Sequence, residues 1–142
     1  MFENVLLAIQ DLATFQTLLL MTIGATAGLI AGAIPGFTIA MAVVLTLPFT
    51  FGMEASQGIA TMIGVYVGGL SGGLMSGILI GIPGTPSSVA TTFDGFPMAR
   101  KGDPGFALGL GVWSSFFGGI IATILLIAVA QLPAVPLVPP SV

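Results

Sequence analysis

The sequence predicts an all-α integral membrane fold, built from glycine-rich transmembrane helices that are interrupted at two Ile-Pro-Gly sites. Apolar residues make up 56% of the 142-residue chain and only 5% are charged, whereas a soluble domain carries about a quarter charged residues. The few charges leave uncharged stretches long enough for spans of roughly 20 residues. Ile-Pro-Gly occurs at 34–36 (the first break) and at 82–84 (the second break), each time after a glycine-striped stretch.

The charge pattern excludes several classes of function. With only two basic residues the chain has no electrostatic footprint for nucleic acid, and its net charge of −3 argues against docking on anionic lipid headgroups. Cysteine and histidine are both absent, which excludes disulfides, thiolate chemistry and the usual zinc sites. We therefore expect no cofactor, no metal and no nucleic-acid partner.

The first part of the chain predicts a surface helix and then a membrane span. Residues 1–14 carry acidic residues but no Lys or Arg, so they do not resemble a cleavable signal peptide, and their apolar spacing favours a short interfacial helix. Residues 15–34 are predicted to form a transmembrane helix. One face of this helix carries small residues four apart, which indicates a packing groove for another helix. These residues are Gly24, Gly28 and Gly32.

The first break should end or kink this span, because proline removes a backbone donor and disfavours helical geometry in the residue before it. Residues 37–51 are apolar but short, so they predict a short or re-entrant helix. Residues 56–82 predict the next span, which carries two rows of small residues. The first glycine row is Ala60, Gly64, Gly68, Gly72 and Ser76, and the second glycine row is Gly69, Gly73, Gly77 and Gly81. Each glycine weakens a helix by about 1 kcal/mol relative to alanine, so tight packing or functional unwinding must compensate.

After the second break we expect a re-entrant segment or half-helix over 84–98, within which Asp94-Gly95-Phe96-Pro97 forms a turn. A polar loop and a last transmembrane helix over 106–131 follow. The loop holds the only basic residues, Arg100 and Lys101, which places it in the cytoplasm by the positive-inside rule. We expect the 142 residues to form a single membrane domain, and the apolar, proline-rich end without a polar tail predicts that this domain is part of a longer protein.

The two breaks together predict a polar cavity inside the membrane. Non-helical backbone is tolerated there only when it is buried in protein or lines an aqueous cavity. A helix that begins just after a break presents free N–H groups and the positive end of its dipole, which suits a substrate carboxylate. The alternative is that both breaks are ordinary interfacial turns between complete spans. The predicted substrate-binding residues are Pro35, Gly36, Thr38, Pro83, Gly84, Thr85, Ser87 and Ser88.

Asp94, together with Thr91, is the predicted site for a coupling cation, H⁺ or Na⁺, because an ionisable residue within a membrane indicates function. The alternative is that Asp94 belongs to an ordinary turn at the water boundary. The stretch Gly69-Leu70-Ser71-Gly72 matches the nucleophile pattern of rhomboid-type proteases. Such a serine needs a base to activate it, and the chain has no histidine, so we do not expect an enzyme.

Residues 64–102 read GVYVGGLSGGLMSGILIGIPGTPSSVATTFDGFPMARKG, residues 28–38 read GLIAGAIPGFT, and residues 47–51 read LPFTF. These stretches resemble the large membrane subunit of tripartite tricarboxylate transporters, the TctA family, over almost the whole chain. Leu74 and Gly81 stand where many members carry Ser and Asn. The large subunit is several times longer than this chain, which resembles its N-terminal part.

The resemblance implies a multi-pass protein of the bacterial inner membrane, part of an inverted-repeat-type secondary transporter that takes up tricarboxylates or related carboxylates by cation symport. Its expected partners are a small membrane subunit, a periplasmic solute-binding protein, the C-terminal part of the large subunit and the lipid bilayer. The resemblance places the predicted site residues on the motifs of the transport site. The alternative is a truncated or split product that serves only as a structural or assembly component of the membrane.

Overall fold

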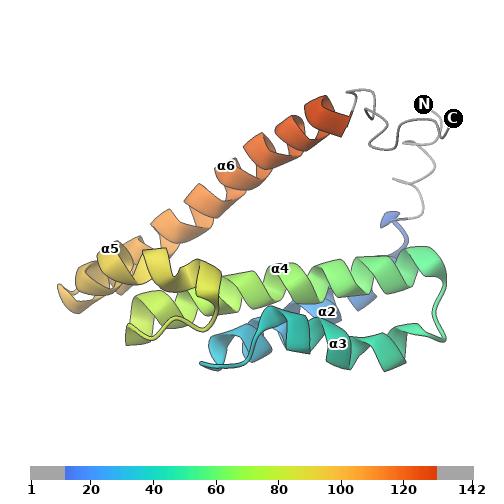
Figure 1. The fold of residues 1–142 in the computed structure, drawn as a ribbon, viewed down its shortest axis with the longest axis horizontal. Helices are drawn as coiled ribbons and strands as arrows, with labels where there is room; N and C mark the ends of the chain where they lie inside the picture. The colour runs from blue at the N-terminus through green and yellow to red at the C-terminus, as the bar shows by residue number, and fades with distance from the viewer. Residues whose placement is uncertain (1–11, 131–142) are drawn as a thin grey trace, which may run out of the picture. The chain divides into compact units, whose positions relative to one another are not determined.

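A computed structural model describes residues 12–130, and these residues are helical without any strand. The elements in chain order are α2 (Phe15–Ala33), α3 (Ile39–Thr50), α4 (Ala55–Ile80), the 3-10 turn η1 (Pro86–Ser88), α5 (Val89–Arg100) and α6 (Pro104–Ala130), as Figure 1 shows. The all-α prediction is confirmed. The interfacial helix expected over 1–14 falls almost entirely outside the described residues, as does the proline-rich end.

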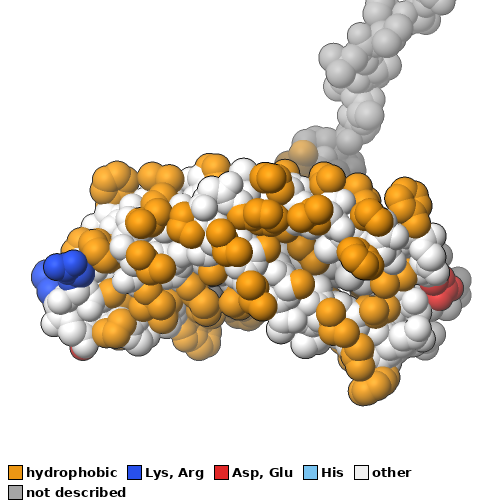
Figure 2. All heavy atoms as spheres, turned by 90° about the horizontal axis from the view of Figure 1, so that it is seen from below, with side chains coloured by type: hydrophobic (Ala, Val, Ile, Leu, Met, Phe, Trp, Pro, Cys, Tyr) orange, Lys and Arg blue, Asp and Glu red, His pale blue; other side chains and the backbone are white. Residues whose placement is uncertain are grey.

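Three of the described helices are long and apolar enough to cross a membrane, namely α2, α4 and α6. The protein is therefore a membrane protein, as the composition predicts. On the face that Figure 2 shows, apolar side chains cover much of the surface, and the charged groups that are visible lie at its two ends. The helix α3 has 12 residues, about 18 Å at 1.5 Å per residue, and is too short for a full span by itself.

The helices α2 and α4 pack through their backbones. A Cβ added to Gly24, Gly28 or Gly32 would collide with the carbonyl groups of Thr61, Val65 and Gly69 respectively. In return, a Cβ on Gly64, Gly68 or Gly72 would collide with the carbonyls of Met21, Ala25 and Leu29. The glycines thus form the packing groove expected of them, because they leave room for the carbonyl groups of the other helix.

These contacts also fix the direction of the two helices. Residue numbers rise together along both helices, so α2 and α4 run parallel. The chain between two parallel neighbours must return to the starting end, and α3 makes this return. Its first residue, Ile39, lies against Gly69 of α4, whereas its last residue, Thr50, lies against Gly58. Figure 1 shows α3 running back alongside α4 in this way.

The helix α4 ends at Ile80, two residues before the expected end of the span. Gly81 takes φ +77°, a left-handed conformation that favours glycine and terminates helices. The chain then folds back along α4 over residues 81–88, which we call the return segment (Figure 1). Thr85 lies against Gly73, which is seven residues before the end of α4. The return segment therefore reaches about 10 Å back along α4 from its C-terminal end.

The turn expected at Asp94-Gly95-Phe96-Pro97 is wrong, because all four residues lie inside α5. Packing on α4 explains the helix, because a Cβ added to Gly95 would lie only 2.7 Å from the Ile78 side chain, so the Gly95 backbone packs closely against it. The Phe96 ring covers Gly81 at the end of α4. Tertiary contacts have thus overridden the local turn preference of Asp-Gly and Pro.

The chain forms two compact units, and the boundary between them lies within α6, after Gly111. Within the first unit, Gly111 lies against the side chains of Leu74 and Ile78. The second unit carries an aromatic cluster in which the rings of Trp113 and Phe117 stack with centroids 5.8 Å apart. The helix starts at Pro104, a favourable first position for proline, rather than at residue 106 as expected.

We predict that Gly28→Ala destabilises the protein by about 1–3 kcal/mol, because the added methyl group is forced against the Val65 carbonyl. The matched control is Gly109→Ala in α6, where nothing lies within 4 Å of the added atom. This control should be neutral or stabilising, since alanine is the better helix former. Thermal unfolding in detergent measures both changes. Equal stability of the two variants would contradict the close backbone packing of α2 on α4.

Candidate functional site

The first break is an open loop between α2 and α3. Ile34 ends α2 in an extended conformation and Gly36 takes φ +87° with nothing within 4 Å of its side-chain position. Thr38 is the N-cap of α3, and its hydroxyl accepts a hydrogen bond from the Met41 amide at 3.3 Å. Pro35, Gly36 and Thr38 are all exposed in this chain.

The second break leads into a buried capping arrangement. Thr85 is the N-cap of η1 and forms a capping box with Ser88, in which each side chain accepts from the other residue's backbone amide. The Ser88 hydroxyl also donates to the Thr85 carbonyl at 2.8 Å. Thr85 is only 2% exposed and Ser88 4%. The hydroxyl of Ser87, an exposed residue, shares a hydrogen bond of 3.1 Å with that of Thr85.

The two breaks meet beside the second half of α4. A Cβ on Gly84 would collide with the carbonyl oxygen of Gly32, two residues before the first break. The same atom would lie 2.7 Å from the Ser76 hydroxyl and 3.1 Å from the Cα of Gly73. The second break is thus packed between the last turn of α2 and the glycine rows of α4, and Gly84 is the residue that allows this approach.

The length of α4 gives the depth of this meeting point. Its 26 residues correspond to about 39 Å, which exceeds a hydrocarbon core of about 30 Å. Gly69 contacts the chain before and after the first break, and Gly73 contacts the chain at the second break. Both glycines lie within about 10 Å of the midpoint of α4. If α4 spans the bilayer, both breaks lie at the depth of the hydrocarbon core.

The predicted site residues therefore fall into two groups. Gly84, Thr85 and Ser88 are buried and Pro83 is half-buried, whereas Ser87 is exposed like the residues of the first break. Among the described residues, every buried side-chain nitrogen or oxygen has a hydrogen-bond partner. The chain's own hydroxyls thus cap part of each helix N-terminus, and the exposed Thr38 and Ser87 offer the accessible hydroxyl groups at the two breaks.

Of the two cation-coupling residues expected from sequence, Thr91 contacts this buried group, whereas Asp94 is exposed. The Thr91 hydroxyl donates to the Ser88 carbonyl at 2.6 Å rather than to Asp94. Asp94 is exposed on α5. Within residues 12–130 there is no group of three or more acidic, histidine or cysteine side chains that could hold a metal ion.

Sequence reasoning missed one residue at the meeting point. Ser76 was assigned to the first glycine row as a small packing residue, but its hydroxyl faces Gly84 and donates to the Gly73 carbonyl at 3.0 Å. It is only 3% exposed. The available signal was that Ser76 is the hydroxyl-bearing member of an otherwise apolar row.

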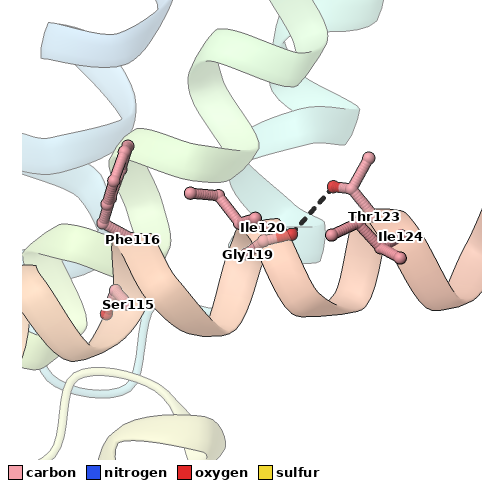
Figure 3. Close-up of a pocket in the computed structure, with 6 residues that line it drawn as sticks. All are labelled: Ser115, Phe116, Gly119, Ile120, Thr123 and Ile124. Atoms are coloured by element: carbon pink, nitrogen blue, oxygen red, sulfur yellow. Dashed lines mark hydrogen bonds between the residues drawn. The ribbon is translucent and has the colours of Figure 1, made fainter.

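The open hollows of the surface lie elsewhere. A groove of about 210 Å³ between α2 and α3 is lined mainly by apolar side chains, among them Ala27, Leu45 and Phe49. A shallow hollow of about 440 Å³ lies on one face of α6, where Thr123 donates to the Gly119 carbonyl at 2.8 Å (Figure 3). The lining residues in Figure 3 all come from this single helix, so the hollow does not enclose a ligand.

Comparison with known proteins decides the family. The family model described as "Tripartite tricarboxylate transporter TctA family" matches residues 18–139, which include both breaks and the whole return segment. The chain belongs to the TctA family. This is a family of membrane components of tripartite tricarboxylate transporters, and the resemblance inferred from the glycine-rich and Pro-Gly motifs is confirmed.

A curated relative of this TctA-family chain is described as "Uncharacterized 52.8 kDa protein in TAR-I ttuC' 3'region", from Agrobacterium vitis. The two sequences are 50% identical over 52 residues, which make up 37% of this chain and 10% of the relative. The match thus covers about a tenth of the relative's length. No solved structure matches the chain.

We predict that Ser88→Ala loosens the return segment, because the buried Thr85 amide loses its acceptor and the capping box is broken. Loss of such a cap costs about 1 kcal/mol or more. Hydrogen exchange of the amides in η1 and the start of α5 should therefore speed up severalfold. The control is Ser87→Ala, at an exposed neighbour outside the capping box, which should change exchange less. Equal exchange in both variants would show that the capping box does not hold the segment.

Proposed function

We propose that this chain forms part of the translocation pathway of a secondary transporter for tricarboxylates or related carboxylates. The observation that carries the proposal is the meeting of the two breaks at the level of Gly69 and Gly73, at a depth where unwound backbone needs protein or water as a partner. Family membership supports it, because the TctA family is named for tricarboxylate transport.

The chemistry at the breaks suits an anion. The first turn of α3 follows the first break directly, so its amide groups and the positive end of its dipole lie beside the exposed Thr38 hydroxyl, and at the second break the exposed Ser87 hydroxyl lies just before α5. A hydroxyl can donate a hydrogen bond to a carboxylate without adding a competing negative charge. We propose that Thr38 and Ser87 contact the carboxylate directly, and that Pro35, Gly36, Pro83, Gly84, Thr85 and Ser88 shape the site.

Uptake against a gradient needs a driving ion, and we propose cation symport with H⁺ or Na⁺. Asp94 remains the proposed side chain for this role in the chain, with Thr91 supporting the helix that carries it. We further propose that the chain works in the bacterial inner membrane with a small membrane subunit, a periplasmic solute-binding protein and the remaining helices of the large subunit. The family's description as tripartite supports these partners.

A purely structural role in the membrane is the competing function. The close backbone packing of α2 and α4 would serve such a role equally well. The exposed Ser87 hydroxyl favours transport, because it lies outside the capping box, whereas the Thr38 hydroxyl also caps α3.

Thiol accessibility tests the proposal, and the chain has no cysteine of its own to interfere. In the complete transporter, we expect Thr38→Cys and Ser87→Cys to react with a hydrophilic, membrane-impermeant thiol reagent, because both positions line an aqueous pathway. Citrate or the transported carboxylate should slow both reactions at least severalfold. The labelling rate is measured with and without the carboxylate.

The control position is Val67, which is 52% exposed and lies at the middle of α4. Val67→Cys should stay unlabelled, because an apolar side chain at this depth indicates a lipid or protein neighbour rather than water. Labelling of both break positions without protection by any carboxylate would contradict the transport proposal and favour the structural role.

A further inference from the structure

The two glycine rows of α4 have different partners. Gly64, Gly68 and Gly72 of the first row receive the backbone of α2. In the second row, a Cβ on Gly73 would lie 2.6 Å from the Thr85 hydroxyl and 2.7 Å from its methyl group. A Cβ on Gly77 would lie 3.1 Å from the Thr91 hydroxyl and 3.3 Å from the Ser88 carbonyl. Gly73 and Gly77 of the second row therefore receive the return segment and the start of α5.

We propose that Gly73 and Gly77 are positioning residues of the transport site, which set the depth and orientation of the return segment against α4. This inference rests on the proposed function, since it concerns the same site. Neither glycine contacts the substrate. They act through Thr85 and Ser88, whose capping box determines where Ser87 points.

The packing around Gly73 leaves the return segment little freedom. Gly84 meets the Gly32 carbonyl of α2, so the segment cannot retreat toward α2 without a collision, and on the α4 side it meets the Ser76 hydroxyl. An added methyl group at Gly73 must therefore move Thr85 itself. Because the buried hydroxyls of Thr85 and Ser88 are hydrogen-bonded to each other's backbone, such a shift changes the whole capping box.

A small shift of this kind should affect substrate binding strongly, because a displacement of about 1 Å in a site can cost a factor of about 100. The distances rank the two glycines. Gly77 has more room than Gly73, with its nearest contact at 3.1 Å instead of 2.6 Å. Gly77→Ala should accordingly have the same effect as Gly73→Ala in a weaker form.

The first experiment measures carboxylate uptake by the complete transporter reconstituted in vesicles. Gly73→Ala should raise KM for the carboxylate about tenfold or more, and Gly77→Ala should raise it less. The matched control is Gly68→Ala, where the added Cβ would collide with the Ala25 carbonyl of α2. This control should lower the amount of assembled protein and leave KM of the assembled fraction unchanged, as expected of a residue that only supports packing.

The second experiment does not depend on transport. The labelling rate of Ser87→Cys by a hydrophilic thiol reagent should change at least severalfold when Gly73→Ala is added, and should stay constant when Gly68→Ala is added. If Gly73→Ala does not assemble, the same comparison is made with Gly77→Ala, for which a smaller change in the same direction is expected.

The outcomes separate the inference from the function on which it rests. Wild-type uptake of carboxylate, combined with an unchanged KM and an unchanged Ser87 labelling rate in Gly73→Ala and Gly77→Ala, would overturn the positioning role and leave the transport function standing. Absence of carboxylate uptake by the wild-type transporter would contradict the proposed function. The labelling rates would then still decide whether Gly73 and Gly77 position the return segment.

Discussion

The direct contact between the backbones of α2 and α4 is the constraint on which the rest of the first unit depends. Each helix presents glycines to the carbonyl groups of the other, and the pairs advance in the same direction along both helices. A parallel pair requires a returning connection, which α3 supplies. It also brings the end of α2 beside the middle of α4, so the first break lies near the level of the middle of α4 and not at the far end of α4. In a membrane, where lipid gives no hydrophobic drive for helix association, such packing is a principal source of stability.

Hydroxyl side chains form hydrogen bonds with part of the unwound backbone at the two breaks. At the first break Thr38 caps α3, and at the second break Thr85 and Ser88 cap each other. These groups satisfy part of the backbone without introducing charge, which is expensive at the depth of the hydrocarbon core. What remains exposed is a pair of hydroxyl-bearing positions next to two helix N-termini. In the transport function that we propose, an uncharged site of this kind would attract the anion by dipoles and hydrogen bonds alone.

Much of the fold could be predicted from residue spacing. Glycines four residues apart indicated the helix-packing faces, and Pro35 and Pro83 indicated the breaks, because both signals are local. The direction of α2 relative to α4 could not be predicted, since spacing alone does not distinguish parallel from antiparallel packing. The helix at Asp94-Gly95 was missed because it depends on Ile78 and on the end of α4. The end of α4 at Gly81 was also missed, as the prolines that follow were the stronger local signal. The sequence motifs identified the candidate site residues. The burial of Thr85 and the contact of Ser76 with Gly84 could be found only in the tertiary structure.

The return of residues 81–88 into the depth of the protein is the central claim, and a pair of spin-label distances tests it most directly. In one variant the labels replace Glu54 and Ser87, and in the other Glu54 and Lys101, so that both distances start at the N-cap of α4. The structure places Ser87 near the level of Gly73 and Gly77, which corresponds to about 30 Å from Glu54 along the axis of α4. The account predicts that the distance to Lys101 is longer by at least about 10 Å. A distance to Ser87 that equals or exceeds the distance to Lys101 would contradict it.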